Sequence, residues 1–134
     1  MGELYKKQQI MTIAIHQSKD SFTKRWISYC IEKQINYKMV DCYSSDIMMQ
    51  LKDCNSLMWH FSQNSPKDFL FAKQLIYSVE AAGKKVFPGF YTSWHFDDKV
   101  GQKYLLEAIE APLIPTWVFY RKQEALKWAE SAMF

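Results

Sequence analysis

The stretch IMTIAIHQSKDSFTKRWISYCIEKQI, residues 10–35, decides the fold class of this chain. Its first seven residues form a short apolar run rich in β-branched side chains, which predicts a buried strand. A polar turn follows at residues 17–20. Apolar side chains then recur at helical spacing from residue 21 to residue 35, with Asp20 or Ser21 as the expected N-cap. A strand followed directly by a helix is the repeating unit of a parallel sheet.

The same alternation continues along the chain. Further strands are predicted at residues 37–43, 56–61, 85–87 and 116–120, and further helices at residues 44–51, 65–82, 97–109 and 123–133. Ser44 and Ser45 are suited to cap the first of these helices, Ser65-Pro66 opens the second, and Gly83 stops it. No hairpin signal is present, so we expect an α/β fold with a three-layer, mostly parallel, Rossmann-like sheet.

The amino-acid composition excludes several classes of protein. The chain has 134 residues with 49% hydrophobic and 23% charged side chains, which excludes wholesale disorder. The net charge of +3 is too small to indicate a nucleic-acid partner, and no apolar run reaches the roughly 20 residues of a membrane helix. Cys30, Cys42 and Cys54 form no CxxC pair, so we expect reduced, buried thiols in a cytoplasmic protein.

Known catalytic motifs are missing from the sequence. The first strand–helix turn has no glycine, and neither a phosphate loop nor a GxSxG elbow occurs, so we predict no catalytic residue. In an open parallel sheet a ligand is expected beyond the carboxyl ends of the strands. His16, His60 and His95 all fall at or near predicted strand ends on this ligand edge, where three imidazoles would suit zinc. Their apolar neighbours and the lack of HExxH spacing favour no metal site, and His60 is instead expected to contact a polar or anionic ligand.

One ordered set of elements resembles a known superfamily. Residues 96–131, FDDKVGQKYLLEAIEAPLIPTWVFYRKQEALKWAES, contain Asp98-Lys99, a Leu105-Leu106 pair, two prolines, the TWVFY segment and a last helix. This order resembles the entry into an ATP-grasp fold. Upstream, DCNSLMWHF, the helix that Gly83 ends, and VFPGFYTSWHFDDK resemble the preceding domain of RimK-like and glutathione-synthetase-like proteins. Carbamoyl-phosphate synthetase large subunits and biotin carboxylase share the superfamily.

The resemblance implies an organisation and an activity. Residues 1–96 would be the pre-ATP-grasp domain, and residues 97–134 the first helix, strand and helix of a truncated ATP-grasp subdomain. The parent would be a ligase that joins a carboxylate to an amine through an acyl-phosphate, with ATP and Mg²⁺. We expect the native chain to continue past Phe134 with the rest of that domain as partner. This chain alone would hold no cofactor and be inactive, and a homodimer through its C-terminal elements is expected.

The same resemblance implies site residues. Lys99 matches a lysine that faces the nucleotide phosphates in some members, although a solvated lysine in a first helical turn explains it equally well. Tyr91, Thr92, Ser93 and His95, together with His60, are candidates for contact with a small-molecule substrate, while Asp97 and Asp98 are expected to cap a helix. The alternative is a non-catalytic Rossmann-like module that binds a partner through its aromatic edge.

Overall fold

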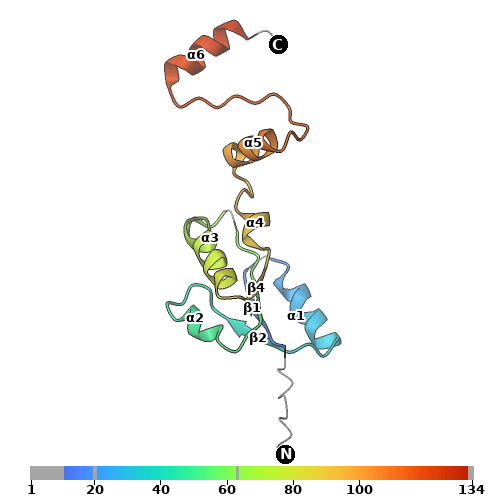
Figure 1. The fold of residues 1–134 in the computed structure, drawn as a ribbon. Coiled ribbons are helices and arrows are strands. Elements are labelled where there is room, and N and C mark those ends of the chain that lie inside the picture. The colour runs from blue at the N-terminus through green and yellow to red at the C-terminus, as the bar shows by residue number, and fades with distance from the viewer. Residues whose placement is uncertain (1–10, 20, 63, 133–134) are drawn as a thin grey trace, which may run out of the picture. The chain divides into compact units, whose positions relative to one another are not determined.

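The computed structural model describes residues 11–19, 21–62 and 64–132, which form two compact units on either side of the Trp94–His95 bond (Figure 1). The first unit alternates strands and short helices. Its elements in order are β1 (Ile13–His16), α1 (Thr23–Glu32), β2 (Tyr37–Val40), α2 (Ile47–Gln50), β3 (Ser56–Met58), α3 (Pro66–Ala81), β4 (Lys85–Phe87) and α4 (Phe90–Ser93). None of the helices described is long and apolar enough to cross a membrane.

The four strands form one parallel sheet in the order β2-β1-β3-β4. Ile13 of β1 is in register with Tyr37 on one side and with Ser56 on the other, and Ser56 is in register with Lys85 of β4. The α/β class and the all-parallel sheet are therefore as predicted, and they are compatible with a Rossmann-like fold. The strands are shorter than expected, because the ladder ends at Val40 and Met58.

Side chains alternate between the two faces of the sheet, and each face has its own cover. Ala14, Val40, Leu57 and Val86 face the cluster that α2 and α3 complete with Ile47, Leu51, Ala72, Leu75, Ile76 and Val79. On the other face, α1 lies against the sheet, where its Trp26 ring meets the Phe87 ring edge-on at 6.1 Å between centroids. Figure 1 shows α1 on one side of the sheet and α2 and α3 on the other.

The boundaries of α3 follow the local sequence. Ser65 is the N-cap, and its hydroxyl oxygen accepts the Asp68 N–H at 3.3 Å while Pro66 occupies the first helical position. The helix ends at Ala81, and Gly83 adopts the left-handed conformation with φ of 77°. Gly83 therefore stops the helix as predicted, because a residue with a Cβ is strained at that φ.

Three helix starts in the first unit differ from the prediction. The N-cap of α1 is Phe22, and Ser21 accepts only the Thr23 N–H at 3.2 Å, while Asp20 lies outside the described residues. Asp46 is the N-cap of α2, and the Ser44 hydroxyl donates to its carboxylate. A short helix, α4, replaces the loop expected after Pro88, because the Gly89 carbonyl accepts both the Thr92 and the Ser93 hydroxyls.

The second unit, described by itself, holds α5 (Lys99–Ala108) and α6 (Lys122–Ser131). The predicted strand at residues 116–120 is wrong: the structure has no strand there, and none of the four strands of the described chain pairs with this segment. Its aromatic side chains pack locally instead, with Trp117 and Trp128 5.0 Å apart between ring centroids. Asp98, not Asp97, caps α5 by accepting the Gly101 N–H at 2.8 Å.

Replacing Ser65 by alanine should lower the free energy of unfolding by about 1–3 kcal/mol, because the Asp68 N–H loses its cap and the buried Asp68 carboxylate loses the Ser65 hydroxyl as a donor. Ser78→Ala in the same helix is the matched control, since the exposed Ser78 hydroxyl only donates back to the Gln74 carbonyl. That control should stay within about 0.5 kcal/mol of the wild type in a urea titration. Equal losses for the two variants would contradict the assigned cap.

Candidate functional site

The strand order places a crevice at one end of the sheet. After β1 the chain enters α1 on one face, and after the adjacent β3 it enters α3 on the other face. The two connections therefore diverge beyond the carboxyl ends of neighbouring strands. In open parallel sheets this divergence is the usual place for a ligand.

A cavity of about 490 Å³ lies at this point. We name it the polar cleft, and its lining comes from the segments that follow β1, β2 and β3: His16, Gln17, Ser18, Lys19, Asp41, Tyr43, Ser62, Ser65 and Asp68. The sequence predicted this edge of the sheet as the ligand edge, and the polar cleft lies at that edge.

Asp68 is the buried centre of the polar cleft. Its side chain is 1% exposed, and its carboxylate accepts the Tyr43 hydroxyl at 2.5 Å, the Ser62 N–H at 2.6 Å and the Ser65 hydroxyl at 3.1 Å. A buried carboxylate is tolerated when donors replace the water it has lost. These three donors come from the loops after β2 and β3, so Asp68 holds the two loops together.

The surroundings of Tyr43 raise the pKa of its hydroxyl group. Burial of the phenol first, and its hydrogen bond to Asp68 second, raise the pKa of Tyr43 to about 12. A tyrosinate in this position would face the Asp68 carboxylate without a proton between them. Tyr43 is therefore a neutral hydrogen-bond donor at the wall of the cleft rather than a general base near neutral pH.

His16 is buried at the end of β1, and its ring is held by the backbone. Nδ1 accepts the Cys42 N–H at 3.0 Å and also lies 3.2 Å from the Val40 carbonyl oxygen. With Nδ1 as the acceptor of the shorter bond, the proton of the neutral ring is assigned to Nε2. The ring also meets Tyr43 and Trp59 edge-on, with centroids 5.0 and 5.7 Å away. Among the described residues no hydrogen bond engages Nε2, which leaves this donor for a ligand.

The charges at the rim of the polar cleft are opposite. Lys19 is exposed, and Asp41, whose side chain is 61% exposed, lies beside His16 with Oδ1 3.8 Å from Nδ1. Among the described residues of the rim, Lys19 supplies a cation and Asp41 an anion, and Oδ1 of Asp41 also accepts the Tyr43 N–H at 2.9 Å. The arrangement suits a small polar molecule that carries both an acidic and a basic group.

The nearest thiol does not supply a nucleophile. Burial, followed by the negative charges of Asp41 and Asp68, raises the pKa of the Cys42 thiol well above its ordinary value. The thiol therefore stays protonated near neutral pH, and only a thiolate is strongly nucleophilic. Cys30, Cys42 and Cys54 are all free and buried, as expected from the sequence.

The predicted substrate residues lie outside the lining of the polar cleft. His60 is half-buried and packs edge-on against Phe22, with 5.1 Å between ring centroids. Tyr91, Thr92 and Ser93 are brought together on α4, where Tyr91 is 82% exposed and Ser93 is buried. The Thr92 and Ser93 hydroxyls are used in capping bonds to the Gly89 carbonyl, so neither is an unengaged donor.

The remaining candidates belong to the second unit. His95 precedes α5, and its carbonyl accepts the Gln102 side-chain amide at 3.1 Å. Lys99 is the first residue of α5, and its exposed Nζ donates to Asp97 Oδ1 at 3.0 Å. This ion pair offsets the unfavourable position of a cation in a first helical turn.

The sequence predicted a ligand edge at the carboxyl ends of the strands, where the polar cleft lies, but the prediction did not include Asp68. The available signal was the spacing Ser65–x–x–Asp68, which is typical of a helix N-terminus and marks a carboxyl group directed back toward the preceding loop. Over the residues that the structure describes, no three His, Cys, Asp or Glu side chains are grouped to hold a metal ion.

Tyr43→Phe should change how stability depends on alkaline pH. Because the folded pKa of about 12 exceeds the ordinary tyrosine value of about 10, the protonated phenol favours the folded state below about pH 10, and this contribution is lost as pH rises from about 10 to about 12. The stability difference between wild type and variant should therefore shrink between about pH 8 and about pH 11 in urea titrations. A difference that stays constant would contradict the Tyr43–Asp68 bond.

Comparison with protein-family models, with curated proteins and with solved structures gives no match for this chain. The resemblance to ATP-grasp proteins therefore stays a prediction from the sequence. The family of the chain is not identified by these comparisons.

Proposed function

We propose that this chain is the substrate-binding front part of an ATP-dependent ligase that joins a carboxylate to an amine through an acyl-phosphate. The observation that carries the proposal is the polar cleft at the point where β1 and β3 diverge. Its rim contains both Lys19 and Asp41, which matches a substrate that bears both a carboxylate and an amine. The ordered elements that resemble ATP-grasp proteins supply the reaction class.

The two units have different roles in the proposed reaction. The first unit binds the substrate, and the second unit contributes Lys99 toward the nucleotide. Formation of an acyl-phosphate requires ATP, with Mg²⁺ to neutralise the charge of the transferred phosphoryl group. The residues of this chain would orient the substrate: Lys19 holds the carboxylate, and Nε2–H of His16 donates to an oxygen of the substrate.

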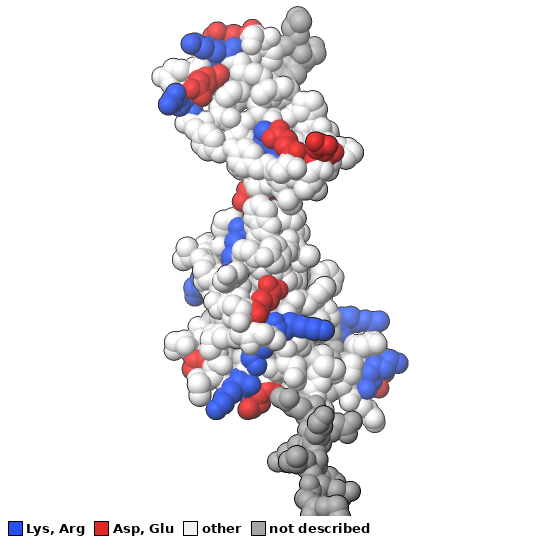
Figure 2. Space-filling view, in the orientation of Figure 1, with Lys and Arg blue, Asp and Glu red and all other residues white. Residues whose placement is uncertain are grey.

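The net charge of +3 and the charges on one face of the chain give no support to a nucleic-acid partner. On the face shown in Figure 2, Lys and Arg side chains are interspersed with Asp and Glu. Proteins that bind nucleic acid usually gather basic side chains on one face. A small polar substrate fits this surface better than a phosphate backbone.

Exposed aromatic side chains support the alternative, a non-catalytic module that binds a protein partner. Phe87 is 59% exposed and Tyr91 is 82% exposed, and both lie at or after the end of β4. Such a module would need neither ATP nor the polar cleft. The two functions therefore differ in whether they require ATP and the polar cleft, and this difference can be measured.

The proposal is tested by measuring the release of inorganic phosphate by the natural protein. In the presence of ATP and Mg²⁺, we expect phosphate release to rise only when the added mixture of amino acids and simple carboxylic acids supplies both a carboxylate and an amine. Lys19→Gln should raise the apparent KM by about three- to tenfold with a smaller change in kcat, because an exposed ion pair is lost. Lys33→Gln is the matched control, since Lys33, the C-cap of α1, pairs with Glu32, lies over the Tyr29 ring and is outside the lining of the polar cleft.

A polypeptide of residues 1–134, tested alone by calorimetry, should bind MgATP negligibly. Absence of stimulated phosphate release with every added mixture would contradict the ligase and favour the interaction module. A KM effect of Lys33→Gln equal to that of Lys19→Gln would contradict the placement of the substrate in the polar cleft.

A further inference from the structure

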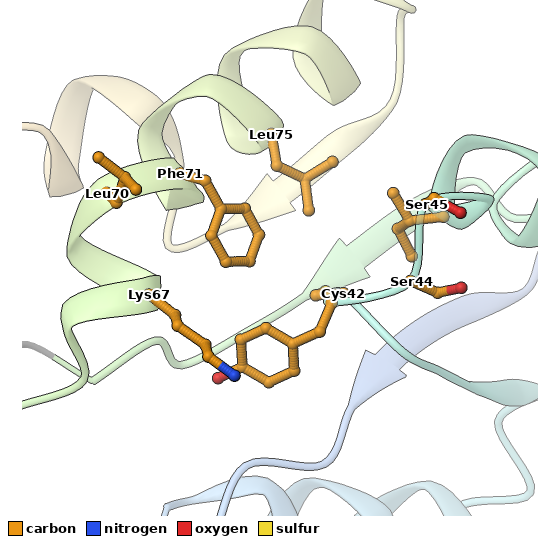
Figure 3. A pocket seen from close by; sticks show the side chains of 9 residues that line it. Cys42, Ser44, Ser45, Lys67, Leu70, Phe71 and Leu75 are labelled. Atoms are coloured by element: carbon orange, nitrogen blue, oxygen red, sulfur yellow. The ribbon is translucent and has the colours of Figure 1, made fainter.

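A second cavity lies beside the polar cleft and differs from it in chemistry. It measures about 500 Å³, within the range of small-molecule sites. We name it the apolar pocket, and its lining is Cys42, Tyr43, Ser44, Ser45, Ile47, Lys67, Leu70, Phe71 and Leu75. Figure 3 shows Phe71 and Leu75 extending from α3 into the space, with Cys42, Ser44 and Ser45 across from them.

The pocket has a rigid floor. The Phe71 ring packs on the fully buried Trp59, with 5.5 Å between centroids, and the Tyr43 ring contacts Phe71 at 5.7 Å. The Tyr43 hydroxyl is fixed by Asp68, so the ring cannot turn freely into the space. A preformed apolar surface of this kind binds a hydrocarbon group without first having to order its own side chains.

Lys67 is the one charged residue of the lining. It is exposed, and within the described part of the chain no carboxylate forms an ion pair or hydrogen bond with its Nζ. It also occupies the first turn of α3, where the helix dipole disfavours a cation. An anion beside Lys67 would neutralise the ammonium group and would itself be stabilised by the positive end of α3.

We propose that the apolar pocket binds a small organic carboxylate with a hydrocarbon body. The chain of the ligand lies against Phe71, Leu75 and Ile47, and its carboxylate pairs with Lys67. This site is separate from the substrate rim formed by Lys19 and Asp41. The proposal goes beyond the ligase function and holds whether or not the protein uses ATP.

Methyl NMR with octanoate tests this site directly, in the absence of ATP. Octanoate should shift the methyl signals of Ile47, Leu70 and Leu75 saturably, with a dissociation constant below about 1 mM. The methyls of Ile15, on the opposite face of the sheet, and of Leu126, in the second unit, are internal controls. Octylamine, which has the same chain and the opposite charge, should not produce the shifts.

Two lysine variants of α3 separate charge recognition from simple apolar adsorption. Lys67→Gln should weaken octanoate binding about three- to tenfold, because it removes the partner of the carboxylate. Lys73→Gln removes the same charge from the same helix at a position outside the lining, where Lys73 lies over the Phe69 ring, and should change the affinity less than about twofold.

Four results would overturn the proposal. The first is the absence of saturable shifts at Ile47, Leu70 and Leu75. The second is equal shifts at Ile15 and Leu126, which would mean non-specific adsorption. The third is an equal effect of the two lysine variants. The fourth is a set of shifts that depend on protein concentration alone, which would assign the pocket to a second copy of the chain.

Discussion

The hydrogen bonds of the Asp68 carboxylate are the constraint on which the ligand edge of the first unit depends. This buried group lies at the start of α3 and accepts from Tyr43 and Ser65 side chains and from the Ser62 backbone. A single carboxylate thus connects the loops that follow β2 and β3. Because burying it without these donors would cost several kcal/mol, the loops and the carboxylate stabilise one another.

Tyr43, which Asp68 holds in place, lines two cavities. Its ring belongs to the lining of both the polar cleft and the apolar pocket, and its hydroxyl is held at 2.5 Å by Asp68. The two cavities therefore share one fixed wall, while their rims differ: Lys19 and Asp41 on one side, Lys67 on the other. A polar and an apolar cavity are in this way placed side by side at the same edge of the sheet.

Local patterns in the sequence predicted the elements whose ends are set by neighbouring residues. Ser65-Pro66 and Gly83 mark the two ends of α3, because capping and a left-handed φ are local requirements. The strand expected at residues 116–120 does not form, because a segment with high β-propensity forms a ladder only where a partner strand exists. The bond from Tyr43 to Asp68 spans 25 residues, so only the packing of α3 on the sheet places the two groups together.

The free energy of unfolding of Asp68→Asn tests the central role of this carboxylate most directly. The amide keeps the volume of the side chain but turns one acceptor into a donor that faces other donors, so we expect a loss of about 2–4 kcal/mol. The Tyr43 hydroxyl should also titrate closer to the ordinary pKa of a tyrosine. Asp53→Asn, in the loop before β3, is the exposed control and should change little. Equal stability of the two variants, with an unchanged Tyr43 titration, would contradict the account.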